Sequence, residues 1–236
     1  MADLPMLYSA PMVRAILREI ENPGTGKTQT RRTLKPLPRR TIFFNPQTAG
    51  KEQFQKPRIA VGDRLYVREA WRVSRMHDRT APRDLKPRTM TVFFEAGGSV
   101  ANQDAPGDWK PAVWPEIGER PDWAGKFRQA MHMPRWASRI TLEVTGVKVE
   151  RLQDCSEADA IAEGIEFCPI EEDGLGGWKC YAPEPKGQDE WSSPYHSYRT
   201  LWDSINGPGA WDKNPWVAAY TFRSVLGNID QIARAA

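Results

Sequence analysis

The chain has 236 residues, of which 40% are hydrophobic, so it is long enough to bury a core, and we expect one domain over residues 1–236 with insertions around 97–126 and 168–194. Its formal net charge of +3 is too small to establish a nucleic-acid partner by itself. Three cysteines without a C-x-x-C pair, no apolar N-terminal segment and no apolar run of about 18 residues argue against disulfide-stabilised, secreted and membrane-spanning proteins.

These exclusions favour a soluble protein of the cytoplasm. His77, His132 and His196 lack the spacing of metal ligands, so we expect no metal and no other cofactor.

The first half of the chain predicts a helix and two strands. Apolar residues recur at helical spacing over 12–21, and the helix should end at 22–24, where the sequence is Asn-Pro-Gly. A Gly-Asp turn at 62–63 precedes an alternating strand that runs to Trp71, and 90–95 is a second strand candidate.

The second half predicts more strands and two capped helices. Residues 140–152 alternate around Gly146, as one long bent strand or two short ones. A short helix over 156–164 has Ser156 as N-cap and Gly164 as its stop, and another over 195–205 should end at 206–207. With a last strand over 216–223 and two long loops over 97–126 and 168–194, this order favours a mixed α+β fold: a small barrel decorated with short helices.

Basic residues are concentrated in one segment. Residues 27–40 contain six Lys or Arg and no Asp or Glu, which is a plausible binding site for an anion or simply a solvated basic loop. The stretch NPGTGKT at 22–28 resembles a phosphate-binding P-loop. However, Glu21 occupies the position of the first glycine, and the context is inverted because a helix precedes the lysine. We therefore expect no ATP site.

Ordered motifs along the chain resemble the ASCH domain, a PUA-like barrel family, in its phage and prophage branch. They are SAPMV at 9–13, KTQTRR at 27–32, GDRLYVRE at 62–69, MPRWASRI at 133–140, AIAEG at 160–164 and NPWV at 214–217. The resemblance implies a small PUA-like β-barrel with a cleft, related to RNA-binding domains. In one bacterial branch it implies an amidohydrolase that removes acyl groups from the N4 amine of cytidine.

In that branch the chemistry is carried by a lysine, a threonine three residues later and a glutamate on a following helix, and the matching positions here are Lys27, Thr30 and Glu163. The chain is about twice as long as those enzymes and has extra sequence over 21–26. Lys27 and Thr30 would lie on opposite faces of a regular strand, so the motif should turn or bulge between them. The alternative is an ordinary ion pair between Lys27 and Glu163, with Thr30 packing or capping.

The candidate binding residues surround these positions. Arg31, Arg32, Arg68, Arg135 and Arg139 could contact phosphates, Trp71 or Trp136 could stack on a base, and the matched motifs add Thr28 and Glu69.

Three hypotheses follow from these residues. The first is an amidohydrolase acting on an N4-acylated cytosine nucleoside, the second is a non-catalytic module that binds RNA or a modified nucleotide, and the third is a metal-independent ribonuclease.

Overall fold

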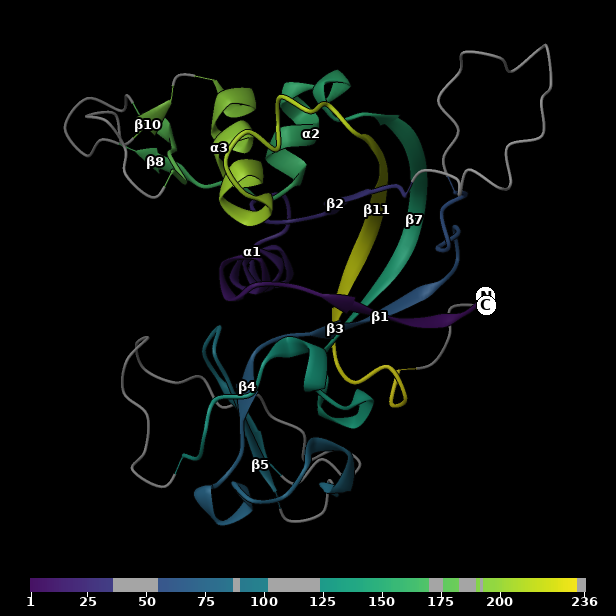
Figure 1. The fold of residues 1–236 in the computed structure, drawn as a ribbon, viewed down its shortest axis with the longest axis vertical. Helices are drawn as coiled ribbons and strands as arrows, with labels where there is room; N and C mark the ends of the chain where they lie inside the picture. Colours follow the sequence, from purple (N-terminus) through teal and green to yellow (C-terminus); the bar gives the residue numbers. More distant parts are fainter. Residues whose placement is uncertain are drawn as a thin grey trace. The chain divides into compact units, whose positions relative to one another are not determined.

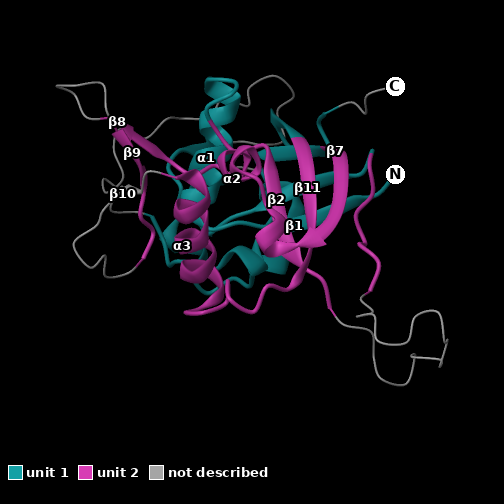
Figure 2. Cartoon of the chain, turned by 90° about the horizontal axis from the view of Figure 1, so that it is seen from above, with its two compact units in different colours: residues 1–25, 62–143, 223–236 teal, residues 26–61, 144–222 magenta. Residues whose placement is uncertain are grey.

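The computed structural model describes residues 1–35, 55–86, 90–101, 124–169, 176–182, 190–191 and 193–232, which form a mixed α+β protein dominated by sheets (Figure 1). The chain divides into two compact units that alternate along the sequence (Figure 2). Unit 1 contains residues 1–25, 62–143 and 223–236, and unit 2 contains residues 26–61 and 144–222. In the part that the structure describes, every helix is too short or too polar to span a membrane.

Unit 1 begins with an edge strand and an amphipathic helix. Strand β1 (Asp3–Leu7) pairs in parallel with β3 (Arg64–Arg68), and β3 pairs antiparallel with the start of β7 (Ile140–Arg151). Helix α1 (Ala10–Glu21) buries Met12, Val13, Ala15 and Ile16, so the predicted helix is confirmed. Its apolar residues recur every three or four positions, which places them on one face.

A second sheet of unit 1 carries its aromatic core. It consists of β4 (Trp71–Arg72), β5 (Thr91–Phe94) and β6 (Ser99–Ala101), all antiparallel. Trp71, Val92, Phe94 and Val100 pack in one buried cluster that also contains Met133. The sequence pattern predicted a single strand as far as Trp71, but the strand is interrupted between Arg68, where β3 ends, and Trp71, where β4 begins.

Unit 2 contains the other two described α-helices and two sets of strands. Strand β2 (Gln29–Thr33) pairs antiparallel with β11 (Trp216–Leu226), while α2 (Glu157–Ala162) packs against α3 (Pro194–Asn206). Tyr198 of α3 packs edge-to-face against Trp202 and Trp211, and all three rings are buried. The two predicted helices are therefore confirmed, and residues 140–151 form one long strand rather than two short ones.

The prediction of a loop over 168–194 is wrong for the residues of this range that the structure describes. There β8 (Phe167–Pro169), β9 (Gly176–Lys179) and β10 (Glu190–Trp191) form an antiparallel sheet in the order β10-β9-β8. These strands are too short for a periodic signal, and tertiary pairing sets them. Of the other predicted loop, 99–101 is strand β6, and 102–123 lies outside the described residues.

The largest sheet has the strand order β1-β3-β7-β11-β2, and β7 and β11 each contribute residues to both units. Among the described strands no pairing closes this sheet, so the PUA-like barrel stays a prediction. The prediction of a single domain also stays open beside the two compact units.

Helix α2 is fixed at both ends by local hydrogen bonds. The Ser156 hydroxyl accepts a hydrogen bond from the Asp159 amide, the Asp159 carboxylate accepts one from the Ser156 amide, and Gly164 has a φ of 84°. These are the capping box and glycine stop that the sequence indicated.

We expect Ser156→Ala to lower the free energy of unfolding by about 1 kcal/mol, because the Asp159 amide at the start of α2 loses the hydroxyl that accepts its hydrogen bond. Ser9→Ala is the matched control, since Ser9 is the N-cap of α1 and its side chain makes no capping hydrogen bond. Urea unfolding of both variants provides the comparison. Equal losses would show that the Ser156 hydroxyl contributes nothing specific.

Candidate functional site

The C-terminal end of α2 docks onto the start of the basic run. The Thr28 amide donates to the Ala162 carbonyl at 2.9 Å, and Lys27 Nζ donates to the Glu163 carbonyl at 2.7 Å. Lys27 Nζ also contacts Glu163 Oε2 at 2.6 Å. A short helix leaves its last carbonyls without partners, and here Lys27 and Thr28 supply the missing donors. Lys27 and Glu163 would have to lie close together to share a catalytic role. They are in contact although they are 136 positions apart in the sequence.

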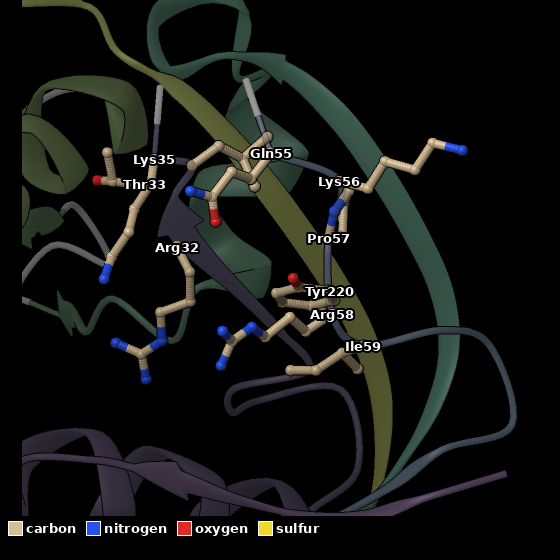
Figure 3. A pocket seen from close by; sticks show the side chains of 10 residues that line it. Arg32, Thr33, Lys35, Gln55, Lys56, Pro57, Arg58, Ile59 and Tyr220 are labelled. Carbon is tan, nitrogen blue, oxygen red and sulfur yellow. The ribbon is translucent and has the colours of Figure 1, made fainter. Parts of the chain in front are cut away.

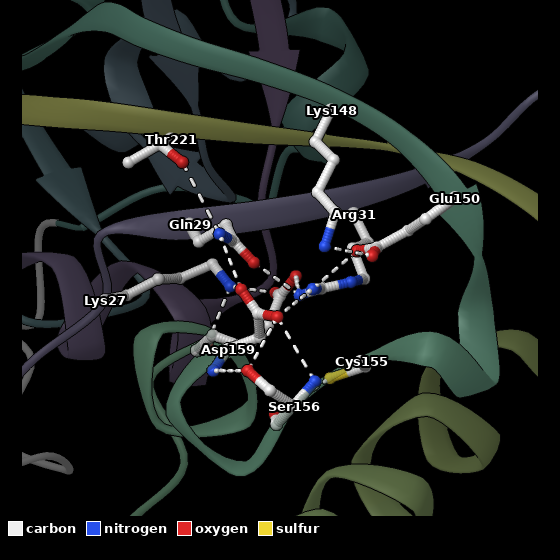
Figure 4. A network of polar contacts seen from close by, with 10 residues as sticks. Lys27, Gln29, Arg31, Lys148, Glu150, Cys155, Ser156, Asp159 and Thr221 are labelled. Carbon is white, nitrogen blue, oxygen red and sulfur yellow. Dashed lines mark hydrogen bonds and ion pairs between the residues drawn. The ribbon is translucent and has the colours of Figure 1, made fainter.

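Arg31 is the centre of a buried network of charges (Figure 4). Its guanidinium lies 2.8 Å from Glu150 Oε1, 3.2 Å from Glu163 Oε1 and 3.3 Å from Asp159 Oδ2. The side chain of Arg31 has no exposed surface, so these carboxylates replace the water that a guanidinium normally binds. The prediction that Arg31 contacts an external anion therefore finds no support, because its donors bind the protein's own carboxylates.

Sequence reasoning missed several members of this network. Gln29 donates to Asp159 at 3.1 Å and accepts from Arg31, Tyr198 hydrogen-bonds to Glu163, and Lys148 pairs with Glu150 at 2.6 Å. No sequence signal separated Glu150 from the other charged residues of its strand, Glu143, Lys148 and Arg151. Its partner Arg31 comes from another element, which no local pattern identifies.

Burial controls protonation in this network. It lowers the pKa of Lys27 below 10.5, although the carboxylate of Glu163 opposes the change. Burial also raises the pKa of Cys155 to about 12, which leaves its thiol protonated and unreactive near neutral pH. For Asp159, burial favours the neutral acid, but hydrogen bonds from Ser156 and the charge of Arg31 outweigh it and lower the pKa.

Strand alternation divides the basic run between two faces of β2. Gln29 and Arg31 both contact residues of α2, so their side chains share one face. Thr30 and Arg32 alternate with them and take the other face, where Thr30 is opposite Tyr220 and Arg32 is opposite Ala218 in β11. Lys27 contacts Glu163 and therefore lies on the same side as Gln29 and Arg31, so the turn or bulge that we expected between Lys27 and Thr30 is not formed. The structure thus brings Lys27 and Glu163 together and directs Thr30 to the opposite face of the sheet.

The opposite face of β2 borders a pocket of about 260 Å³ (Figure 3). Arg32 and Tyr220 line it from β2 and β11, and residues 33–35 and 55–59 complete it. The Gln55 amide donates to the Lys35 carbonyl at 2.8 Å, which holds the two segments side by side. None of the described residues that line this pocket is Asp or Glu.

The other predicted binding residues belong to unit 1, and three of them, Glu69, Trp71 and Arg139, are buried there. Trp71 has no exposed surface and is a core residue, so it offers no stacking platform. Glu69 and Arg139 form a buried ion pair at 2.8 Å, with the Arg139 guanidinium 3.9 Å from the Phe94 ring centroid. Both charges are therefore paired with each other inside unit 1.

Three further candidates are held by contacts within unit 1. Arg68 donates to the carbonyls of Met131 and Met133, and Arg135 pairs with Asp3 at 2.8 Å and Asp230 at 2.6 Å. Trp136 is half-buried against the aromatic cluster.

No metal cluster occurs among the residues that the structure describes, judged by groups of three or more His, Cys, Asp or Glu. No family model matches the chain, and no curated protein or solved structure matches it.

Proposed function

We propose that the protein is an ASCH-type, PUA-like protein that hydrolyses the amide of N4-acylated cytosine nucleosides, with Lys27 as the base and Glu163 as its partner. The observation that supports this most is the contact between Lys27 Nζ and Glu163 in a buried environment that lowers the pKa of the lysine. Lowering the pKa of a lysine widens the pH range in which its amine is neutral, and a neutral amine is a usable general base.

The geometry of the amine favours this role. A neutral lysine amine has two N–H bonds and one lone pair, and Glu163 offers two acceptors to Lys27 Nζ: its backbone carbonyl and its carboxylate. When both hydrogens point to these oxygens, the lone pair is the remaining position and can accept a proton. Arg31 donates to the other carboxylate oxygen of Glu163, which fixes the orientation of the carboxylate.

The proposed reaction uses water as the nucleophile. Lys27 accepts a proton from the water as its oxygen bonds to the acyl carbon, and the resulting tetrahedral intermediate then breaks its C–N bond. The ammonium of Lys27 returns the proton to the N4 amine that leaves. The products are a carboxylic acid and a cytosine nucleoside, so the base is regenerated and all atoms balance.

A second candidate function is binding of RNA or a modified nucleotide without catalysis. Two observations favour it over catalysis. Thr30 lies on the face of β2 opposite Arg31, and Lys27 is only 2% exposed, as a structural ion pair between the start of β2 and the end of α2 would be. Metal-independent RNA cleavage has no observation in its favour within the described residues.

Incubation of the full chain with N4-acetylcytidine, followed by chromatographic detection of cytidine, tests the proposal. We expect turnover by the natural protein and by Lys213→Ala, which changes an exposed lysine of unit 2. Absence of turnover by a correctly folded protein would leave the binding function as the better account.

Thr30→Val should change the rate of this hydrolysis by less than about threefold, because the hydroxyl of Thr30 lies on the face of β2 opposite Arg31. Valine keeps the shape of threonine and removes only the hydroxyl. Steady-state kinetics with Thr33→Val as control provides the measurement. A loss of about 100-fold or more would instead identify Thr30 as a nucleophile.

A further inference from the structure

Lys148 is the exposed end of the buried charge network. Lys148 and Glu150 are two positions apart in β7, so their side chains lie on the same face of the strand, and they pair at 2.6 Å. The side chain of Lys148 is 63% exposed, whereas that of Glu150 is buried. Figure 4 shows the Lys148 amine beside Glu150 and Arg31. A side chain in contact with solvent is therefore also in direct contact with the network.

The contacts continue from Glu150 to the proposed base. Arg31 donates to Glu150 at 2.8 Å through one nitrogen and to Glu163 at 3.2 Å through the other. The second oxygen of Glu163 contacts Lys27 Nζ at 2.6 Å. Charges of opposite sign thus alternate from the exposed lysine to the buried one. Because Arg31 binds both carboxylates, a change at one of them alters its contact with the other.

The charges of this network balance when Lys148 is counted. Three cations and three carboxylates are in contact, namely Lys27, Arg31, Lys148, Glu150, Asp159 and Glu163. When Lys27 loses its proton, the network carries one uncompensated negative charge, and without Lys148 it would carry two. A buried site disfavours such an excess of like charge. The charge of Lys148 therefore favours the neutral form of Lys27.

The neighbours of Lys27 and Glu163 keep one protonation state near neutral pH. The other titratable or charged groups that act on these two residues are Arg31, Arg32, Tyr198 and Cys155. The arginines are always charged, and burial raises the pKa of the phenol and of the thiol, so both of these stay protonated. Lys148 is charged as well, because its hydrogen bond to Glu150 raises its pKa.

We propose that Lys148 is a positioning residue for Lys27. It binds Glu150 from the solvent side, so Arg31 remains shared between two carboxylates. Glu163 in turn divides its charge between Arg31 and Lys27. Loss of the Lys148 charge draws Arg31 toward Glu150 and leaves Glu163 to stabilise the Lys27 ammonium. Lys148 acts on hydrolysis only if Lys27 is the base, as in the proposed function, but its effect on the ionisation of Lys27 does not depend on catalysis.

Carbon-13 NMR of the full chain, labelled at lysine Cε, measures the titration of Lys27 without any substrate. The resonance that is absent from Lys27→Met identifies Lys27, and Lys27→Arg serves if the first variant does not fold. We expect Lys148→Met to move the titration midpoint of Lys27 to higher pH by about half a pH unit, or about threefold in proton affinity, a small effect for members of one salt-bridge network. Lys148→Arg keeps the charge and should leave the midpoint unchanged.

Lys179→Met is the matched control. Lys179 is another partly exposed lysine of unit 2, and it pairs with Glu166 at 2.8 Å rather than with Glu150. Its substitution removes the same charge and should leave the midpoint of Lys27 unchanged. A shift as large as that in Lys148→Met would indicate a general effect of surface charge and overturn the proposal. No shift in Lys148→Met, or an equal shift in Lys148→Arg, would also contradict it.

Kinetics with N4-acetylcytidine separates the role of Lys148 from the proposed function. If Lys27 is the base, Lys148→Met should lower kcat near neutral pH by about threefold and leave the rate at high pH unchanged, since Lys27 is fully neutral there. A midpoint shift in a protein that hydrolyses nothing would support the role of Lys148 and contradict the hydrolase. Hydrolysis that depends on Lys27, without a midpoint shift in Lys148→Met, would support the hydrolase and contradict the role of Lys148.

Discussion

Lys27→Met is expected to lower kcat/KM for N4-acetylcytidine by about 10²–10⁴-fold, the usual contribution of a general base. Methionine keeps an unbranched apolar stem in the buried position but has no amine. The loss should fall mainly on kcat, because Lys27 acts on the water and contributes little to binding of the nucleoside. Steady-state kinetics at one pH, with the melting temperature measured in parallel, gives the result.

The pH dependence provides a sharper test of the same residue. Lys27 acts only when neutral, so the rate should rise with pH and level off above its folded pKa, which burial sets below 10.5. Stability should change in the same direction. Between the folded pKa and 10.5 the unfolded chain binds more protons than the folded chain, so this contribution to stability rises with pH and is lost as pH falls through the folded pKa.

Two comparisons separate catalysis from folding. Glu163→Gln keeps the shape of the side chain and one acceptor oxygen while removing the negative charge. It should lower the rate and shift the pH profile to lower pH, since Glu163 raises the pKa of Lys27. Lys213→Ala should change neither the rate nor the profile. A folded Lys27→Met that retains the natural rate and profile would refute the role of Lys27 as base.

Arg31→Met should lower the free energy of unfolding by about 3–5 kcal/mol at neutral pH, the largest effect on stability that we expect in this protein. Its guanidinium lies within 3.3 Å of three carboxylates, and Glu150 and Glu163 are themselves buried. Removing the cation leaves both carboxylates in a site from which water is excluded. Urea unfolding at several pH values provides the measurement.

Arg32→Met is the matched control, since it makes the same substitution at the next position, on the face of β2 that borders the pocket. We expect it to cost less than about 1 kcal/mol, as most substitutions outside a buried network do. Urea unfolding of Arg31→Met, Arg32→Met and the natural protein under the same conditions gives this difference.

A double variant tests the coupling. Glu150→Gln should recover part of the stability lost in Arg31→Met, because it removes one of the buried carboxylate charges that lose the guanidinium, and the other partner of Glu150, Lys148, is exposed to water. Additive losses from the two substitutions would mean that Arg31 and Glu150 contribute independently, which the 2.8 Å contact does not lead us to expect.

The local elements of this protein could be predicted from its sequence because their determinants lie within a few residues. Ser156, Asp159 and Gly164 specify α2 through hydrogen bonds that close over three positions and through a positive φ. Helix α1 followed from the spacing of its apolar residues. The strands β8, β9 and β10 could not be predicted, because each is at most four residues long and gains its stability from pairing.

The basic run shows where sequence reasoning stops. Its residue types alone indicated positive charge and a resemblance that paired Lys27 with Glu163, and the fold does bring these two residues together. Only the tertiary structure decided that Arg31 is neutralised by Glu150 from a strand 119 positions away, that Thr30 and Arg32 face the other side, and that Trp71 is core. The physical reason is that alternation in a strand assigns neighbours to opposite faces, while the identity of each face depends on which distant elements pack against it.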